Sequence, residues 1–483
     1  MPTNHFFKRT ALVCSLISFS YLLSAQTPLQ QFLRNPALKH ASVGVNVADL
    51  SRGKTLLSHN ADKSLTPASV QKLITTAVAT EILGADFCYT TLVALDKDDP
   101  SRILVIGSGD PTLGSSVFDD NPDAFFIHCA SELRRKLPAD KKYSVYVVDN
   151  RFGYMGISPE WTWVDMGNYY ASGAYGISIF DNTYKLFFNT TSRNVCPQII
   201  RTEPAIKGLT FDNYLTLNTL GQDNGYIYGM PFSYERSLRG DIPAGRAEFS
   251  IKGDIPDPGL LLGETMADYL RRSGFEIEKV ETSRRDYVSR LCETDKTQPY
   301  KIGTPLFEYR SRPMSEMIRE INVQSNNHYA EHLIRTVGRT RNTDIYSDAL
   351  QEGINAIDLF WKSKGIDTKA LTMYDGCGLA PQNAISPKFL TDLLAYMYAG
   401  KNSAVFFDSL PKAGEEGTVR SFMTNTAYKG IIRMKSGSIG GVQCYAGYLV
   451  SGDKKLVFSV MVNKFNGTRA EVRRAIEKLL SSL

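Results

Sequence analysis

The chain has few of the features that mark metal-binding, membrane-spanning or nucleic-acid-binding proteins. It has seven cysteines among 483 residues and no C-x-x-C pair, which argues against a cysteine-ligated metal centre. No segment after residue 25 approaches the length of apolar chain that crosses a bilayer. A G-x-S-x-G sequence is absent, so an α/β-hydrolase is not expected. The net charge of +5 is mildly basic and gives no sign of nucleic-acid binding.

Residues 1–25 have the pattern of an export signal. A basic start precedes an apolar core over residues 11–23, and Leu23-Ser24-Ala25 offers a cleavage site. Cys14 would suit a lipid anchor, but the residue before it is not small, so soluble export is favoured. We expect an exported, periplasmic protein, soluble or peripherally associated with a membrane. In an oxidising compartment some of the six remaining cysteines could pair, and the sequence leaves the pairing open.

Three short motifs lie far apart in the chain and in a fixed order. Ser69-Val70-Gln71-Lys72 is S-x-x-K, Ser325-Asn326-Asn327 is S-x-N, and Lys435-Ser436-Gly437-Ser438 is a variant of K-[ST]-G. A serine three residues before a lysine arises by chance in most long proteins. The ordered set is far more specific, and it is typical of the serine acyl-transfer enzymes that penicillin acylates.

The spacing of the first motif suits a serine nucleophile with a lysine base. Apolar residues recur at helical spacing after Ser69, which predicts a core helix that begins near it, with Thr66 as a possible cap. Positions three apart share a helix face, so the Lys72 amine should lie beside the Ser69 hydroxyl. Lowering the pKa of a lysine from ~10.4 to ~7 requires roughly 4.6 kcal/mol. Burial and a second cation, for which Lys435 is the candidate, would supply it.

Both ends of the chain predict parts of one α+β domain. Residues 42–58 have the alternation of a β-hairpin, three strands are expected within 431–463, and a helix within 468–480. Further helices are predicted at 313–337, 344–364 and 387–399. An antiparallel sheet with helices on both faces accounts for these elements.

The middle of the chain has a different pattern, with short strand-like runs between loops. We expect a discontinuous domain made of residues 26–88 and 290–483. A largely β region over residues 89–289 is inserted in it, with a smaller β module nested at about 183–252.

One motif favours another kind of chemistry. His328-Tyr329-Ala330-Glu331-His332 matches H-x-x-E-H, an inverted zinc-protease motif, in which two histidines on one helix could reach one metal. A third ligand would have to come from elsewhere, and the motif directly follows Ser325-Asn326-Asn327. Side chains on ordinary helix faces are therefore the favoured interpretation.

Taken together, the chain resembles the low-molecular-mass class C penicillin-binding proteins, the DacB-type D-alanyl-D-alanine carboxypeptidases/endopeptidases. The resemblance runs from about Ala41 to the C-terminus. Besides the three motifs it includes Gly109-Asp110-Pro111-Thr112-Leu113, Val148-Asp149 ahead of Phe152, Asp375-Gly376-Cys377-Gly378-Leu379 and Gly417-Thr418-Val419. It implies a penicillin-recognising transpeptidase-like domain that extra domains interrupt between S-x-x-K and S-x-N.

The resemblance also implies a role for each motif residue. Ser69 would be the nucleophile, Lys72 its base, and Ser325 a proton relay near the leaving amine. Substrate would be bound by Asn327, Lys435, Ser436, Gly437 and Ser438, with Lys435 holding the terminal carboxylate. The backbone N–H groups of Ser69 and Ser438 would form the oxyanion hole.

The sequence departs from the family pattern at two of these positions. Ser436 stands where threonine is commoner, which keeps the hydroxyl. Cys377 stands where the family usually has serine in D-G-S-G, and the sequence does not show what this changes.

The implied function is an exported serine peptidase that acts on the D-Ala-D-Ala end of peptidoglycan stems or on D-Ala cross-links. Its partners would be stem peptides and β-lactams, with no nucleic acid, metal or organic cofactor. The alternatives are a related β-lactamase or D-esterase, a cell-wall-binding protein without turnover, or a zinc peptidase that uses His328 and His332. The intact motifs argue against loss of turnover. The oligomeric state and the preference between carboxypeptidase and endopeptidase stay open.

Overall fold

The computed structural model describes residues 27–192, 196–284 and 298–483. The predicted export signal at residues 1–25 lies outside them, as does Cys292. Within the described residues, no helix combines the length and apolar character that crossing a membrane requires. The five described cysteines are free thiols, namely Cys88, Cys129, Cys196, Cys377 and Cys444.

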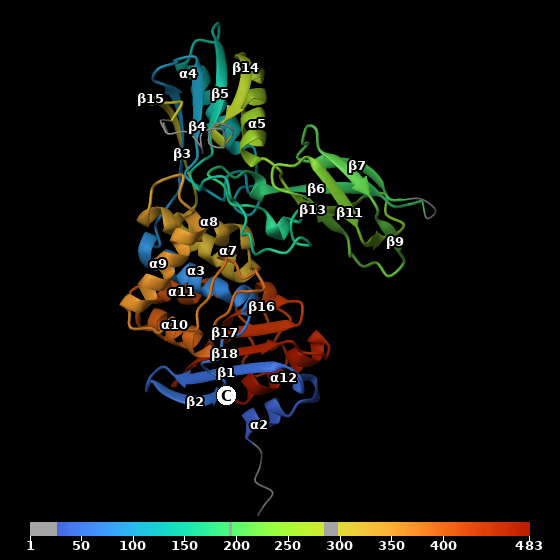
Figure 1. Ribbon diagram of the computed structural model, residues 1–483, viewed down its shortest axis with the longest axis vertical. Helices are drawn as coiled ribbons and strands as arrows, with labels where there is room; N and C mark the ends of the chain where they lie inside the picture. Colours follow the sequence, from blue (N-terminus) through green and yellow to red (C-terminus); the bar gives the residue numbers. More distant parts are fainter. Residues whose placement is uncertain (1–26, 193–195, 285–297) are drawn as a thin grey trace, which may run out of the picture.

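A five-stranded antiparallel sheet is built from both ends of the chain (Figure 1). Its order is β16-β17-β18-β1-β2, and β1 pairs with β18 from Ser42 opposite Asn463 to Asp49 opposite Leu456. The predicted hairpin and the three predicted C-terminal strands are therefore correct. The bounds are Ser42–Asp49 for β1, Lys54–His59 for β2, Ile432–Ile439 for β16, Val442–Ser451 for β17 and Lys454–Asn463 for β18.

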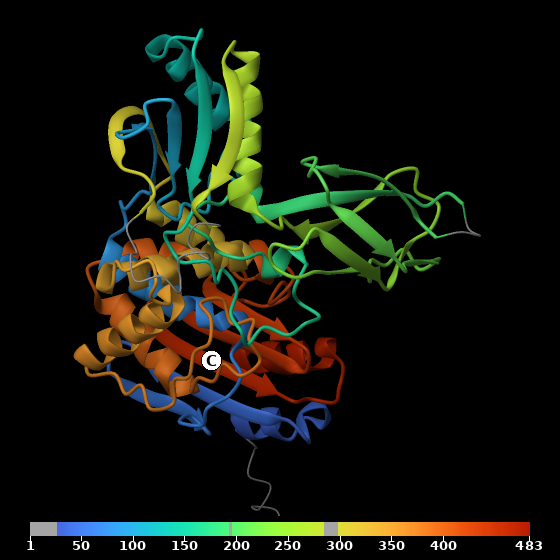
Figure 2. The same cartoon turned by 45° about the horizontal axis from the view of Figure 1, so that its top comes forward.

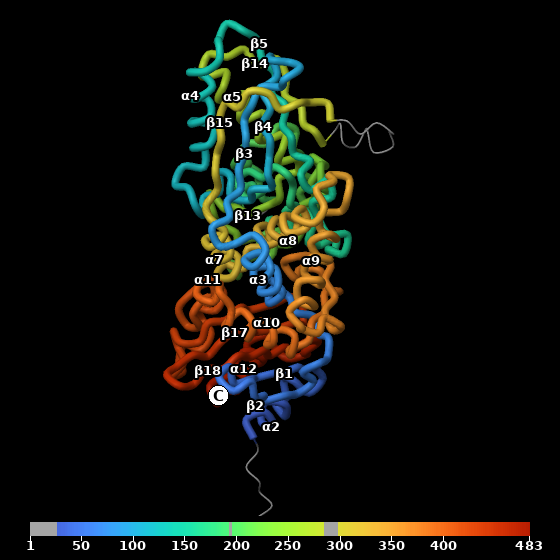
Figure 3. The backbone as a smooth tube through the Cα atoms, turned by 90° about the vertical axis from the view of Figure 1, so that its left-hand side faces the viewer, coloured from blue at the N-terminus to red at the C-terminus, as the bar shows by residue number. Residues whose placement is uncertain are grey.

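Helices cover both faces of this sheet, because its strand residues alternate between two apolar clusters. On one face, Val45 and Val460 pack against α12 (Arg469–Ser481) and the short α2 (Pro28–Leu33). On the other, Ala446 and Met461 join the core of the larger helical layer. That layer, which lies between the two large sheets in Figure 3, contains α3 (Lys72–Leu83), α7 (Met314–Gln324), α8 (Asn327–Arg341), α9 (Ala349–Ser363), α10 (Pro387–Ala399) and α11 (Ser403–Ser409). The predicted α+β fold is confirmed.

A second five-stranded sheet lies at the other end of the long axis. Its order is β14-β5-β4-β3-β15; β14, β5 and β4 run parallel, and β3 is antiparallel to both of its neighbours. Helices α4 (Ala124–Lys136) and α5 (Pro258–Arg272) pack on it. The strands are β3 (Thr90–Asp96), β4 (Arg102–Ile106), β5 (Lys142–Val148), β14 (Glu276–Thr282) and β15 (Ile302–Arg310).

A smaller all-β lobe projects to the side of the molecule (Figure 2). It contains the sheets β13-β6-β7 and β10-β11-β8 and the pair β12-β9. Its strands lie between Thr183 and Asp254, and the nested β module expected at about 183–252 stays a prediction. The strands are β6 (Thr183–Asn189), β7 (Gln198–Glu203), β8 (Thr210–Asn213), β9 (Thr216–Asn218), β10 (Tyr226–Tyr228), β11 (Glu235–Arg239), β12 (Asp241–Pro243) and β13 (Phe249–Asp254).

The strand pairing bears on where the insertion ends. The sequence assigned residues 290–483 to the catalytic part, but β15 pairs with β3, and Arg310 lies opposite Thr90. The second sheet therefore extends to residue 310. We propose an insertion over residues 89–310 in place of 89–289; the division into domains otherwise stays a prediction.

Candidate active site

The three motifs meet where β16 passes the first turns of α3 and α8. Lys72 Nζ lies 2.6 Å from Asn327 Oδ1, and Lys435 Nζ lies 2.9 Å from Ser325 Oγ. A Cβ atom on Gly437 would lie 3.0 Å from the backbone nitrogen of Ser69. Each motif thus touches another, although they are far apart in the chain.

Ser69 lies in a single 3₁₀ turn, η2 (Ala68–Gln71), and the α-helix begins only at Lys72. The predicted capping by Thr66 is wrong: Pro67 precedes the turn, and the Thr66 hydroxyl donates to the Pro381 carbonyl at 3.3 Å. Ala68 has a φ of 48°, in the left-handed region that a residue with a side chain adopts only at a cost. The predicted pairing is nevertheless present, with Lys72 Nζ 2.9 Å from Ser69 Oγ.

The environment of Lys72 suits a general base. Its side chain is fully buried, and burial lowers the pKa of the amine against the opposing influence of nearby acidic groups. Besides Ser69, Nζ contacts Asn327 Oδ1 at 2.6 Å and the Cys377 carbonyl at 2.7 Å. A neutral amine has two hydrogens and one lone pair, and both of these oxygens can only accept. In the neutral form, the lone pair would therefore be directed at the Ser69 hydroxyl.

Lys435 is the second buried lysine. Its Nζ donates to Ser325 Oγ and to the Ser436 carbonyl, both at 2.9 Å. Burial, and then repulsion by Lys72, lower the pKa of Lys435 well below its usual value. Repulsion by Lys72 thus contributes to the low pKa of Lys435, but Lys435 is not among the influences on the pKa of Lys72, which burial lowers; the predicted effect of Lys435 on Lys72 stays a prediction.

The second motif occupies a break between two helices. The sequence predicted one helix over 313–337, but Ser325 has φ 64° and ψ 37° and ends α7. Asn326 then caps α8, since its side chain accepts from the Tyr329 N–H at 3.1 Å. This break brings both Ser325 and Asn327 to the site. The Asn327 Nδ2 donates to the Tyr170 carbonyl of the inserted region at 2.7 Å, which fixes Oδ1 toward Lys72.

The third motif lies on β16, the edge strand of the sheet. A Cβ on Gly437 would meet the Pro67 carbonyl oxygen at 2.4 Å and the Val70 nitrogen at 2.9 Å, so only glycine allows the strand to approach the Ser69 turn. The Ser436 hydroxyl lies 2.8 Å from Thr418 Oγ1, and the Ser438 hydroxyl 3.3 Å from Gln443 Oε1.

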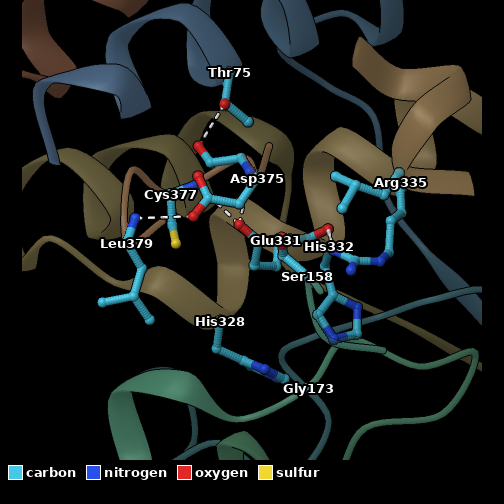
Figure 4. A network of polar contacts seen from close by, with 12 residues as sticks. Thr75, Ser158, Gly173, His328, Glu331, His332, Arg335, Asp375, Cys377 and Leu379 are labelled. Carbon is cyan, nitrogen blue, oxygen red and sulfur yellow. Dashed lines mark hydrogen bonds and ion pairs between the residues drawn. The ribbon is translucent and has the colours of Figure 1, made fainter. Parts of the chain in front are cut away.

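A buried loop over residues 375–380 supplies the Cys377 carbonyl, and sequence reasoning missed what holds it (Figure 4). Asp375 is fully buried and accepts from the backbone N–H groups of Gly378, Leu379 and Ala380. Glu331 on α8 accepts from those of Gly376 and Cys377. Two carboxylates thus hold five consecutive N–H groups, and only the D-G-x-G-L resemblance pointed to this segment.

The histidines of the H-x-x-E-H motif lie away from Glu331. Both ring nitrogens of His332 are used, at 2.8 Å from the Gly109 carbonyl and 2.8 Å from Ser178 Oγ. Burial lowers the pKa of His328 to about 3, and its Nδ1 lies 3.4 Å from Ser172 Oγ. Figure 4 shows the two rings on the side of α8 that faces the inserted region. The helix thus directs the three motif residues to separate partners.

Glu331, Asp375 and Cys377 each bring one possible metal-ligand atom within 4.8 Å of the others. Their chemistry does not suit a metal. The carboxylate oxygens already accept hydrogen bonds from backbone N–H groups and from Arg335, and burial raises the pKa of the Cys377 thiol well above its usual value. A thiol that stays protonated is a poor ligand.

The site and fold agree with one known family. The sequence model of the D-Ala-D-Ala carboxypeptidase 3 (S13) family matches residues 25–483 of this chain. The chain belongs to this family. The predictions of a DacB-type penicillin-binding protein and of a serine-type D-Ala-D-Ala carboxypeptidase are thereby confirmed.

Similar proteins cover nearly the whole chain. A D-alanyl-D-alanine carboxypeptidase of Actinomadura sp. (strain R39) is 26% identical over 92% of this chain and 82% of its own length. The D-alanyl-D-alanine carboxypeptidase DacB of Haemophilus influenzae is 21% identical over 92% of each chain. The crystal structure of penicillin binding protein 4 (dacB) from H. influenzae shares the fold, with a TM-score of 0.75 and 18% identity over 94% of this chain and 98% of that chain.

Proposed function

We propose that the enzyme hydrolyses D-Ala-D-Ala peptide ends through an ester on Ser69, and that penicillin acylates the same hydroxyl. One observation carries this assignment of residues. The Lys72 amine is buried, burial lowers its pKa, and Nζ lies 2.9 Å from Ser69 Oγ with two acceptor oxygens as its other partners. This is the arrangement that a serine nucleophile needs for activation by a neighbouring base.

In the proposed reaction, Lys72 takes the Ser69 proton as Oγ attacks the carbonyl of the penultimate D-Ala. The oxyanion accepts hydrogen bonds from the backbone N–H groups of Ser69 and Ser438. The C–N bond then breaks as the proton held by Lys72 passes, through the Ser325 hydroxyl, to the departing amine of the terminal D-Ala, which leaves Lys72 neutral again. Water hydrolyses the ester in a second step that uses the same base.

Lys435 favours substrates that end in a free carboxylate, because its ammonium group would pair with that carboxylate. Burial and repulsion by Lys72 lower the pKa of its amine. A bound carboxylate would have the opposite effect and would stabilise the ammonium form. We therefore propose carboxypeptidase action on stem ends as the main activity, with cleavage of D-Ala cross-links as the weaker one.

The proposed substrate implies an exported enzyme that works on peptidoglycan. The basic and apolar pattern of residues 1–25 supports export. A second crystal structure of the H. influenzae protein, with a TM-score of 0.73 and 16% identity, is a complex with a β-lactam. That complex supports the proposal that β-lactams bind this chain as well.

The test is labelling with a fluorescent penicillin, followed by mass spectrometry of the tryptic peptides. We expect the adduct on Ser69, no label on Ser69→Ala, and normal label on the control Ser64→Ala, whose serine is exposed. Lys72→Arg should lose at least ~10² in acylation rate, because a guanidinium cannot accept the proton. An adduct on another residue, or an arginine variant that acylates normally, would refute the assignment.

A further inference from the structure

Helix α8 carries a buried carboxylate whose hydrogen bonds lead to the base. Glu331 and Arg335 are both buried, and Arg335 Nη1 donates to Glu331 Oε2 at 2.7 Å. The other oxygen, Oε1, accepts from the N–H groups of Gly376 at 2.7 Å and Cys377 at 2.8 Å. One oxygen that accepts from two consecutive N–H groups fixes the orientation of both peptide planes.

The Cys377 carbonyl connects this arrangement to Lys72. It accepts from Nζ at 2.7 Å and so takes one of the two hydrogens of the neutral amine. If the loop turned away, that hydrogen would lose its partner and the lone pair would lose its direction toward Ser69. The loop is also tied to α3, since Thr75 Oγ1 donates to the Gly376 carbonyl at 2.6 Å.

We propose that Glu331 is a positioning residue for acylation, which holds the Gly376–Cys377 segment so that the Cys377 carbonyl directs the Lys72 lone pair at Ser69. The proposal rests on the roles assigned above to Ser69 and Lys72. A buried ion pair is by itself weak support for stability, because desolvation offsets much of its attraction. The carboxylate of Glu331 is therefore better explained by its orientation of the loop than by a contribution to stability.

Burial raises the pKa of Glu331, and Arg335 opposes this by stabilising the carboxylate, whose negative charge also acts on the Lys72 amine through space. Burial lowers the pKa of Lys72, and the negative charge of Glu331 is among the influences that oppose this lowering. Glu331→Gln removes the charge and puts an NH2 group, which cannot accept, in place of one of the two oxygens, so either Arg335 or the loop N–H groups lose their acceptor. The pKa of Lys72 should then fall further, so the amine stays neutral to lower pH. The acidic limb of the acylation profile should move to lower pH.

The experiment measures penicillin acylation of the full-length enzyme against pH for wild type, Glu331→Gln and Arg339→Gln. Arg339 is the matched control, because it is a buried cation of the same helix that donates hydrogen bonds to Arg151, Asn342 and Ser347. We expect Glu331→Gln to acylate between about 10- and 100-fold more slowly, as misplacement of a catalytic group by up to ~1 Å implies. Its acidic limb should move down, and Arg339→Gln should keep both rate and limb.

The proposal is overturned if folded Glu331→Gln keeps the wild-type rate and limb, or if its only change is one that Arg339→Gln shares. If Glu331→Gln does not fold, E331Q/R335M removes both buried charges and should show the same loss of rate; a wild-type rate in that variant would also overturn the proposal. Failure of the proposed function would be seen separately, because the wild-type label would then not lie on Ser69.

Discussion

Replacing Gly437 by alanine tests how closely β16 must approach the nucleophile. The new Cβ would lie 2.4 Å from the Pro67 carbonyl oxygen, whereas real Cβ atoms essentially never come closer than 3.0 Å. The strand or the Ser69 turn must therefore move by at least ~0.6 Å, the difference between these distances. The backbone nitrogen of Ser69, a proposed oxyanion donor, lies 3.0 Å from the same Cβ position.

The expected loss follows from that displacement. Misplacement of reacting groups by ~1 Å can cost about 10² in rate, and loss of one oxyanion donor costs a similar factor or more. We expect Gly437→Ala to be acylated by penicillin about 30- to 100-fold more slowly. Overpacking should also lower the free energy of unfolding by about 1–3 kcal/mol, which leaves the protein folded if its stability is ordinary.

The assay is the rate of fluorescent-penicillin acylation, with urea unfolding measured on the same preparations. Gly440→Ala is the matched control, because Gly440 follows β16 and a Cβ there has no atom within 4 Å. It should acylate at the wild-type rate. The reasoning is refuted if Gly437→Ala acylates within about twofold of Gly440→Ala, since the close approach of β16 would then be unnecessary for the reaction.

Three further predictions concern Lys435, His328 and the zinc hypothesis for the H-x-x-E-H motif. Lys435→Gln should raise KM and lower kcat for a D-Ala-D-Ala peptide, because the proposed partner of the terminal carboxylate is lost; unchanged KM and kcat would contradict it. His328 has a folded pKa of about 3, below its unfolded value, so its stabilisation is complete above ~6.5 and is lost as the pH falls toward 3. Urea unfolding across this range should therefore depend less on pH in His328→Gln than in wild type. EDTA should leave D-Ala release unchanged, and activity restored by zinc would support the H-x-x-E-H interpretation.

Sequence reasoning found the elements whose pattern is carried by neighbouring residues. The hairpin at 42–58 and the helix at 468–480 have clear periodicity, and the structure places β1, β2 and α12 there. The Ser69–Lys72 proximity was also predictable, because a 3₁₀ turn that runs into an α-helix keeps residues three apart on the same side.

The break at Ser325 was not predictable from periodicity. Buried residues continue on both sides of it, from Ile321 in α7 to Leu333 in α8, so the apolar pattern does not mark where the helix ends. The break depends on a left-handed conformation at a serine, which few residues other than glycine adopt. Only the S-x-N resemblance singled out this position.

The role of Glu331 was hidden for a different reason. The sequence shows that residues 328, 331 and 332 lie near one another on a helix, but it does not show what each side chain faces. In the structure Glu331 reaches the loop at 376–377, while His332 contacts Gly109 and Ser178. A motif defined by spacing was misleading because α8 is buried on almost every side.

Helix α8 also explains how a long insertion can separate the first two motifs without separating their chemistry. Its first residue, Asn327, donates to the Tyr170 carbonyl of the inserted region and accepts from Lys72. Because the amide has one donor end and one acceptor end, the contact with Tyr170 determines that Oδ1 faces Lys72, the proposed base. Further along the helix, Glu331 fixes the second acceptor of the same amine through Cys377. Two of the three partners of Lys72 Nζ therefore depend on the insertion and on the 375–380 loop, and α8 joins them.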